Sequence, residues 1–381
     1  MRRSASNNPS GPPPPPSLSS EETFVASSPG RICLFGEHQD YLGLPVVPCA
    51  ISLRVKIRAR RRNDLKIHVS LPDIGQEEHF GLRARIPYRK ERDYFRSGVN
   101  VMRRAGFRFS RGLDCTVHGT IPINTGTASS SALVVSWIAL LAFVSDVHRQ
   151  LSPGECARFA HEAEVLEFRE PGGMMDHLAA AFGGVLTVDF TGGVSVRQQR
   201  TDLGAFVLGD SGEPKDTKGI LSRVKEGVLE ILRTLTKENA GFSLSAVTGE
   251  EVEQRGSLLP PGERALLAGT VRNRDITREA SALLDATELD RRRLGELLNE
   301  HQAVLRDVLK ISTPKIDGMI EAARHAGAYG AKINGSGGGG CMFAYAPELP
   351  ERVAEAIASA GGKPYIVSVG DGTRAATGTD L

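Results

Sequence analysis

A run of small residues directly before a long apolar segment constrains this chain most. The run is Pro122-Ile-Asn-Thr-Gly126-Thr-Ala-Ser129-Ser130-Ser131-Ala132, and residues 129–143 are apolar nearly all round, which predicts a buried helix. Unpaired backbone N–H groups and the helix dipole make the start of such a helix a cradle for phosphate. A serine N-cap on an ordinary core helix is the alternative. The run is not the G-x-x-x-x-G-K-[ST] loop, because no lysine follows Gly126 at the required place.

A second glycine-rich segment lies near the end of the chain. It reads Lys332-Ile-Asn-Gly335-Ser336-Gly337-Gly338-Gly339-Gly340-Cys341, with glycine in five of the six positions 335–340. Such a segment lets the backbone approach a ligand closely. Strands are predicted at 331–333 and 341–345, and a flexible linker, the alternative, seldom separates two buried strands. We therefore interpret this segment as functional.

A third segment, near the start, combines glycines with charged side chains. It reads Ser28-Pro-Gly30-Arg31-Ile-Cys-Leu-Phe-Gly36-Glu37-His38-Gln39-Asp40-Tyr41-Leu-Gly43. Glu, His and Asp in a loop between apolar strands offer hydrogen-bond donors and acceptors to a polyhydroxylated ligand, and the arginine offers a fixed positive charge. A charged surface turn is the alternative. We expect no zinc site, because a fourth ligand is missing.

Composition excludes several classes of function. Lys plus Arg number 47 and Asp plus Glu 45, so the net charge of +2 gives no general reason to bind nucleic acid. No apolar run reaches the roughly 18 residues that a membrane span needs. The five cysteines are scattered and include no C-x-x-C pair, which fits the reducing cytosol. We expect a cytoplasmic protein without a membrane or nucleic-acid partner, and nothing implies an obligate protein partner.

The 381 residues suit an α+β fold with two lobes, because strands and helices alternate without regular βαβ spacing. Beyond the strands named above, strands are predicted within 23–59 and at 113–117 and 184–190. Further helices are predicted at 153–168, 218–235, 261–284, 290–309 and 312–326. Ser152, Pro153 and Glu155 supply an N-cap, a first-turn proline and a capping-box acid for the helix that begins at 153.

In this order and spacing, the three segments resemble the GHMP small-molecule kinases, the superfamily of galactokinase, homoserine kinase, mevalonate kinase and phosphomevalonate kinase. The resemblance covers roughly residues 24–346. It implies two lobes with the active site in the cleft between them, ATP as co-substrate and Mg²⁺. Within the superfamily, Arg31 and the Glu37-His38-x-Asp40-Tyr41 sequence look like galactokinase and its sugar-binding signature.

The resemblance also suggests an organisation into domains. We expect a disordered Pro/Ser-rich tail at 1–22, an N-terminal GHMP kinase domain at 23–200, a C-terminal one at 201–369 and a flexible tail at 370–381. The run of five prolines at 12–16 cannot pack enough apolar surface to offset its ordering entropy.

Two more stretches support the resemblance. Gly172-Gly-Met-Met175-Asp176-His177 looks like the galactokinase G-I-M-D-Q stretch, whose aspartate is the catalytic acid-base residue. A cap on the helix that follows is the alternative role for Asp176. Ala163-Glu164 matches the pair whose glutamate binds Mg²⁺ in the family, and small Ala160 and Ala157 would leave room for a metal–phosphate unit. A solvent-facing glutamate is the alternative there.

The second half departs from galactokinase. Asp210-Ser211-Gly212 with Asp216-Thr217, and Ser312-Thr-Pro-Lys315-Ile-Asp317 with Ala331-Lys332, look more like mevalonate kinase. Thr127, Ala128 and Ser131 also differ from the usual second motif. The mixture leaves the identity of the phosphate acceptor open.

The resemblance implies a role for each matching residue. Asp176 and Arg31 would be catalytic; Glu37, His38 and Asp40 would bind the substrate; Gly126, Ser129, Ser130, Ser131, Gly337 and Gly338 would bind ATP phosphates; and Ser130 and Glu164 would bind Mg²⁺. The resulting hypothesis is an ATP-dependent kinase of a sugar's anomeric hydroxyl. Mevalonate or another sugar as acceptor, and a sugar sensor without catalysis, are the alternatives.

Overall fold

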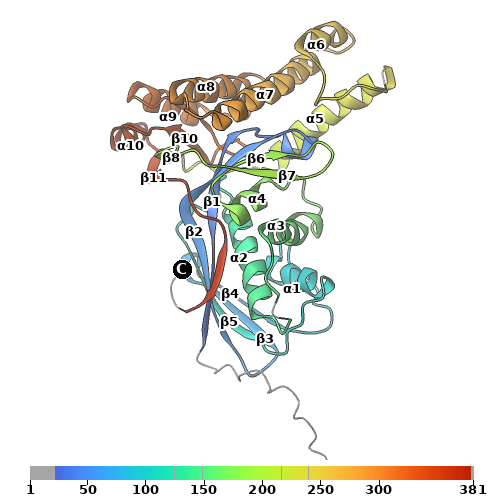
Figure 1. The fold of residues 1–381 in the computed structure, drawn as a ribbon, viewed down its shortest axis with the longest axis vertical. Helices are drawn as coiled ribbons and strands as arrows, with labels where there is room; N and C mark the ends of the chain where they lie inside the picture. Colours follow the sequence, from blue (N-terminus) through green and yellow to red (C-terminus); the bar gives the residue numbers. More distant parts are fainter. Residues whose placement is uncertain (1–21, 124, 148, 216, 239, 379–381) are drawn as a thin grey trace, which may run out of the picture.

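The computed structural model describes residues 22–378 except 124, 148, 216 and 239, and folds them into two sheets with attached helices (Figure 1). The strands are β1 (Thr23–Phe35), β2 (Val47–Arg61), β3 (Lys66–Leu71), β4 (Gln76–Gly81), β5 (Leu113–Gly119), β6 (Val185–Asp189), β7 (Ser195–Gln199), β8 (Phe206–Asp210), β9 (Gly330–Ile333), β10 (Cys341–Tyr345), β11 (Lys363–Val367) and β12 (Arg374–Thr377). The helices are α1 (Tyr94–Arg104), α2 (Ser129–Val144), α3 (Pro153–His161), α4 (Met175–Phe182), α5 (Thr217–Glu238), α6 (Gly249–Gly256), α7 (Pro261–Asp285), α8 (Arg291–Asp307), α9 (Pro314–His325) and α10 (Pro350–Ser359).

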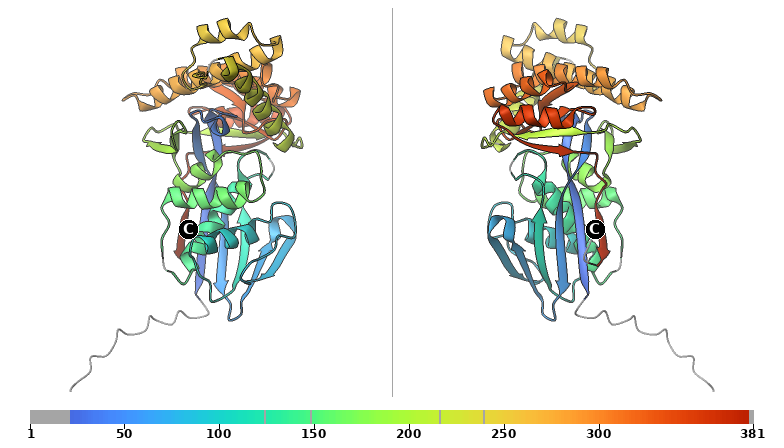
Figure 2. Two further views of the ribbon diagram at one scale, coloured as in Figure 1. Left: turned by 90° about the vertical axis from the view of Figure 1, so that its right-hand side faces the viewer. Right: turned by 90° about the vertical axis from the view of Figure 1, so that its left-hand side faces the viewer.

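The first lobe is a mixed sheet with helices on one face. Its strands run in the order β12-β1-β2-β5-β3-β4, and β6 and β7 extend it from β2. The side views show α1–α4 gathered on one side of this sheet (Figure 2). The apolar helix α2 packs against β1 and β2, where burial of its side chains, Trp137 among them, provides much of the core.

The second lobe is a four-stranded antiparallel sheet in the order β11-β8-β10-β9. Helices α8, α9 and α10 contact this sheet, and α7 packs beside α8 and also meets α5 and α6. The two lobes share a core, since Leu34 and Phe35 of β1 pack with Phe206 of β8 and Phe343 of β10. One end of the β1–β2 pair is therefore enclosed by the second lobe.

The structure confirms the predicted fold class, α+β with two lobes, and most of the predicted elements. The buried helix at 129–143 is α2, and the predicted strand at 341–345 is β10. The five cysteines are free and buried, as the sequence predicts. No helix in the part of the chain that is described combines the length and apolar character needed to cross a bilayer.

The predicted helix at 153–168 is wrong in its second half. It starts as predicted, with Ser152 as N-cap in a capping box with Glu155, but α3 ends at His161. The next residues, Glu162–Leu166, form a wider π-type turn in which the N–H of Glu167 donates to the carbonyl of Glu162 at 3.0 Å. Such turns are frequent at functional sites, and this one carries Glu164, which lines the cleft between the lobes.

The flexible tail expected from Gly370 is also wrong for part of its length. Residues Arg374–Thr377 form β12, which pairs antiparallel with Phe24–Ser27 of β1. The edge of β1 offers unpaired N–H and C=O groups that a short polar segment can satisfy. The expected N-terminal tail up to residue 21, and residues 379–381, lie outside the described residues.

A group of buried polar side chains lies between the lobes. Lys332 of β9 forms an ion pair with Glu37, and both side chains are almost fully buried. The Lys332 ammonium also donates to the carbonyls of Cys33 at 3.1 Å and Ile333 at 3.0 Å. His301 of α8 lies beside them, with Nδ1 3.7 Å from Glu37 Oε2. Burial, aided by the charge of Lys332, lowers the pKa of His301 well below its usual value.

Because the folded chain keeps His301 neutral, acid should destabilise the protein. The unfolded histidine binds a proton as pH falls through about 6.5, whereas the folded one does not. The free energy of unfolding of the wild type should therefore fall more steeply than that of His301→Leu, by about 1.4 kcal/mol per pH unit below that value. Urea unfolding between pH 7.5 and 5 measures this difference. His325→Leu, at an exposed position on α9, is the control, and parallel curves for the wild type and His301→Leu would contradict the prediction.

Candidate functional site

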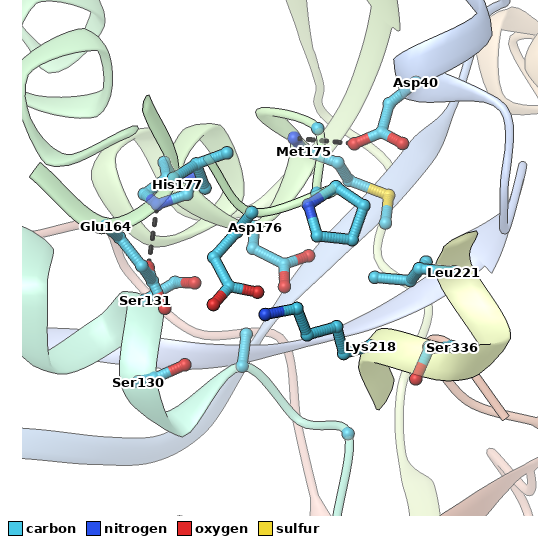
Figure 3. A pocket seen from close by; sticks show the side chains of 18 of the residues that line it. Asp40, Ser130, Ser131, Glu164, Met175, Asp176, His177, Lys218, Leu221 and Ser336 are labelled. Atoms are coloured by element: carbon cyan, nitrogen blue, oxygen red, sulfur yellow. Dashed lines mark hydrogen bonds and ion pairs between the residues drawn. The ribbon is translucent and has the colours of Figure 1, made fainter. Parts of the chain in front are cut away.

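The three glycine-rich segments meet at one cleft between the lobes, with a volume of about 690 Å³ (Figure 3). Its walls include Arg31, Glu37, His38, Asp40, Tyr41, Gly126, Ser129, Ser130, Ser131, Glu164, Gly173, Asp176, His177, Lys215, Lys218, Gly335 and Ser336. A cleft therefore lies where the resemblance predicts the active site, between the two lobes. Residues more than 300 positions apart in the chain, such as Arg31 and Gly335, share this cleft.

The loop before α2 is held in an unusual backbone conformation. Gly126 has φ of 88° and Ala128, the N-cap of α2, has φ of 59°. A Cβ added to Gly126 would lie 2.9 Å from the carbonyl oxygen of Asn334, so only glycine fits there. The helix then begins at Ser129, and its first N–H groups have no partner within the helix. With Ser129, Ser130 and Ser131 in the wall of the cleft, this helix start is suited to hold phosphate.

Asp176 and Arg31 form a two-pronged ion pair in the cleft. Arg31 Nε lies 2.8 Å from Oδ1 of Asp176, and Arg31 Nη2 lies 2.9 Å from Oδ2. The third nitrogen of the guanidinium, Nη1, donates to the carbonyl of Gly126. The Asp176 side chain is 28% exposed and that of Arg31 only 5%, so the carboxylate faces the open cleft and the guanidinium lies behind it. Helix α4 is capped by Met174, so Asp176 is not its N-cap.

Glu164 lies on the π-type turn after α3, beside the start of α2. Its carboxylate accepts a hydrogen bond from His177 Nε2 at 2.8 Å. Burial alone would raise the pKa of Glu164, but this hydrogen bond, the charge of His177 and the nearby hydroxyls of Ser130 and Ser131 outweigh burial and lower the pKa. Sequence reasoning did not identify the His177 contact, because the two residues are 13 positions apart.

The oxygens around Glu164 suit Mg²⁺, which prefers carboxylate, hydroxyl, phosphate and water ligands. The buried, ionised carboxylate and the serine hydroxyls form such a donor set at the phosphate cradle. Within the described ranges, no group of three or more His, Cys, Asp or Glu side chains is placed to hold a metal by itself. A magnesium ion here would therefore take its other ligands from phosphate and water.

Asp40 is held against the backbone on the other side of Asp176. Its carboxylate accepts the N–H of Tyr41 at 2.9 Å and that of Met175 at 3.3 Å. Burial, and then the nearby charge of Asp176, raise the pKa of Asp40. A Cβ on Gly173 would lie 2.0 Å from Asp40 Oδ2, so the backbone of the 172–175 segment fits closely around this carboxylate.

Glu37 and His38 are largely occupied by contacts within the protein. Glu37 pairs with Lys332, as described above. Both ring nitrogens of His38 have partners: Nε2 lies 3.1 Å from the carbonyl of Ser336, and Nδ1 lies 2.7 Å from the hydroxyl of Tyr41. Burial lowers the pKa of His38 to about 4, so the ring is neutral, with Nε2–H donating and Nδ1 accepting. Through these contacts both side chains hold the early glycine-rich segment in place. That they contact substrate stays a prediction.

The late glycine segment reaches the cleft through Gly335 and Ser336. A Cβ on Gly337 would lie 2.5 Å from the carbonyl oxygen of Ile311, and one on Gly338 would lie 2.0 Å from Ile220 Cδ1. Neither Gly337 nor Gly338 is part of the cleft wall, so their contact with ATP also stays a prediction.

Sequence reasoning missed two lysines in the cleft. Figure 3 shows Lys218 reaching from the start of α5 toward Asp176. Lys215 lies against the phosphate loop, since a Cβ on Gly126 would be 2.5 Å from its Nζ. Burial, and then Arg31, lower the pKa of Lys215 to about 8. Neither ammonium forms an ion pair with any residue that the structure describes, so both are available to an anionic ligand. The only sequence signal was their position just after Asp210-Ser211-Gly212.

Comparison with protein families finds three matches along the chain. Residues 93–184 match the GHMP kinases N terminal domain, and residues 282–363 match the GHMP kinases C terminal model. Residues 17–61, which contain the Glu37-His38-x-Asp40 sequence, match the galactokinase galactose-binding signature.

Relatives of two kinds share this similarity. The chain is 29% identical over 360 residues to a mevalonate kinase of Thermococcus gammatolerans, covering 91% of this chain and 96% of the relative. It is also 29% identical over 343 residues to a galactokinase of Actinobacillus succinogenes, covering 86% of each.

Solved structures show the same fold. Lactococcus lactis galactokinase complexed with galactose matches with a TM-score of 0.82 at 23% identity, over 93% of this chain and 95% of that one. Methanococcus jannaschii mevalonate kinase matches with a TM-score of 0.69 at 17% identity, over 91% and 98%.

The fit of Gly173 around Asp40 gives a stability prediction. Gly173→Ala should push the carboxylate off its two N–H donors and lower the free energy of unfolding by about 1–3 kcal/mol, the cost of leaving buried polar groups unpaired. Gly172→Ala is the matched control, because its Cβ would meet only Val165 Cγ2, at 3.9 Å. Urea unfolding of both variants measures the difference. Equal free energies of unfolding for the two variants would show that the Asp40 side chain moves aside without loss of stability.

Proposed function

Since this chain belongs to the GHMP kinase family, we propose that it catalyses ATP-dependent phosphorylation of the anomeric hydroxyl of a sugar. The observation that carries the proposal is the pair of carboxylates that share the cleft. Asp176, backed by Arg31, lies beside the phosphate loop, and the partly buried Asp40 lies on its far side. An acceptor with several neutral hydroxyl groups can donate to both.

Asp176 is the group we propose to act on the acceptor. Its exposed carboxylate can accept the proton of the attacking hydroxyl or orient it, while Arg31 offsets the charge of the carboxylate from behind. Phosphoryl transfer depends mainly on positioning and on neutralising charge, and less on covalent chemistry. The arrangement of a carboxylate between an acceptor pocket and a phosphate cradle supplies both.

The helix start and the lysines are proposed to hold ATP. N–H groups at the start of α2 and the hydroxyls of Ser129 and Ser130 would bind phosphate oxygens, with Gly126 allowing close approach. Lys215 and Lys218 would neutralise negative charge near Asp176. Ser130 and Glu164 would hold Mg²⁺, which when bound spreads and offsets the charge of the phosphates. His177 would fix the Glu164 carboxylate in its position.

Mevalonate is the second candidate acceptor. Two observations favour it. The mevalonate kinase of Thermococcus gammatolerans aligns over nearly the whole chain, and Lys215 and Lys218, which have no ion-pair partner among the described residues, could bind the carboxylate of an acid. Asp40 argues against mevalonate, because a second carboxylate beside Asp176 repels an anionic acceptor and attracts hydroxyl donors.

A panel of acceptors tests the proposal. ADP formation should depend on a sugar when neutral sugars, uronic acids, amino sugars and mevalonate are compared at saturating Mg·ATP, and ³¹P NMR should identify a sugar 1-phosphate. Turnover of mevalonate without any sugar would overturn the acceptor assignment. Absence of turnover with every acceptor would overturn the proposed catalysis.

Asp176→Asn should lower kcat by roughly two to four powers of ten, the usual contribution of a positioned acid-base group. Asparagine keeps the size of the side chain, so the KM values for acceptor and ATP should remain close to those of the wild type. Steady-state kinetics measures both parameters. Asp371→Asn, at an exposed position that is not part of the cleft wall, is the control. If Asp176→Asn keeps a third or more of wild-type kcat, far outside that span, Asp176 has no acid-base role.

A further inference from the structure

The side chain of Asn334 touches all three glycine-rich segments. It belongs to the late segment and is fully buried. Its Oδ1 accepts the N–H of Cys33 in the early segment at 2.9 Å, and its Nδ2 donates to the carbonyl of Gly126 in the phosphate loop at 2.9 Å. The orientation of the amide is defined, because an N–H can only donate and a carbonyl can only accept.

The carbonyl of Gly126 receives a second donor, the Nη1 of Arg31. Arg31 and Cys33 are two residues apart on β1, so the contacts close a ring. The ring runs from Cys33 through Asn334 and Gly126 to Arg31, and returns along the backbone of β1. The remaining nitrogens of Arg31 hold Asp176. The position of the proposed catalytic carboxylate therefore depends on a ring that Asn334 completes.

Two further contacts join these segments through backbone atoms alone. The N–H of Cys341 donates to the carbonyl of Thr125 at 2.8 Å, and that of Arg31 to Thr127 at 3.1 Å. These bonds hold the loops together, but neither of them ends on the carbonyl of Gly126. Asn334 donates to that carbonyl from the side of the second lobe. The carbonyl in turn accepts a hydrogen bond from Nη1 of Arg31 and so orients the guanidinium.

We propose that Asn334 is a positioning residue that aligns Arg31 and the phosphate loop with each other across the two lobes. The inference rests on the proposed function, because it concerns the alignment of a phosphoryl-transfer site. Asn334 is absent from the cleft wall and is fully buried. It acts through Gly126 and Arg31, where a shift of about 1 Å is enough to cost roughly a hundredfold in rate.

Asn334→Val and Asn334→Thr form a matched pair to test this. The two side chains have nearly the same shape, but only threonine has a hydroxyl that can accept from Cys33 or donate to Gly126. Val should lower kcat by roughly ten- to a hundredfold and raise the KM for ATP, with the KM for the acceptor nearly unchanged. Thr should lie between Val and the wild type. Circular dichroism checks that each variant is folded.

A double-mutant cycle with Arg31→Lys separates positioning from a merely structural role. If Asn334 acts through the guanidinium fork, Asn334→Val should have little further effect on kcat once Arg31 is lysine. The inference would be overturned if kcat of the double variant falls by the product of the two single losses. It would also be overturned if folded Asn334→Val has the kcat of the wild type. Should the Val variant fail to fold, Asn334→Ser takes its place in the cycle, because its small polar side chain leaves room for water at the two backbone groups.

The failure of the proposed function can be recognised separately. If the wild-type protein phosphorylates neither sugars nor mevalonate, the proposed function fails. The role of Asn334 is then tested by measuring the affinity for Mg·ATP by calorimetry. Affinity should fall several-fold in Asn334→Val and less in Asn334→Thr, since the phosphate loop loses its alignment in the first. Equal affinities of the wild type and Asn334→Val would overturn the inference in that case.

Discussion

Two loops from different lobes approach each other backbone to backbone, and the rest of the site depends on this contact. A Cβ on Gly126 would lie 2.9 Å from the carbonyl oxygen of Asn334, and one on Gly335 would lie 2.9 Å from the carbonyl oxygen of Gly126. Glycine at both positions allows the approach. It brings the phosphate cradle of the first lobe beside the late segment of the second, and it places the Gly126 carbonyl between Arg31 and Asn334.

Burial of charge decides which polar residues remain available to a ligand. Glu37 and Lys332 neutralise each other between the lobes, and His38 is kept neutral between Tyr41 and the carbonyl of Ser336. A buried charge without a partner would be costly, so these groups are held by the protein itself. Asp40 and Asp176 differ, because they are only partly buried, and Lys215 and Lys218 in the same cleft wall supply positive charge without ion-pair partners in the described structure.

Local signals predicted much of the fold but not all of it. The apolar helix α2 and strand β10 have strong patterns, and both were predicted with nearly correct bounds. The hairpin of β3 and β4 was missed, because β4 (Gln76–Gly81) is polar and shows no alternation. Strand β12 was missed because small polar residues form a strand only when a neighbour's edge supplies hydrogen-bond partners. The turn at Glu162–Leu166 likewise has no local sequence signal.

The sequence alone determined the three glycine-rich segments and their order, because glycine freedom and helix capping are properties of neighbouring residues. The resemblance that these segments carry pointed to the acids and the arginine that the structure places in the cleft wall. The family also follows from these segments. Only the tertiary structure decided that Glu37 pairs with Lys332, that His177 holds Glu164, that Lys215 lies beside Gly126, and that Asn334 joins all three segments. Contacts between residues far apart in the chain depend on how two lobes pack, and that packing leaves no periodic trace in the sequence.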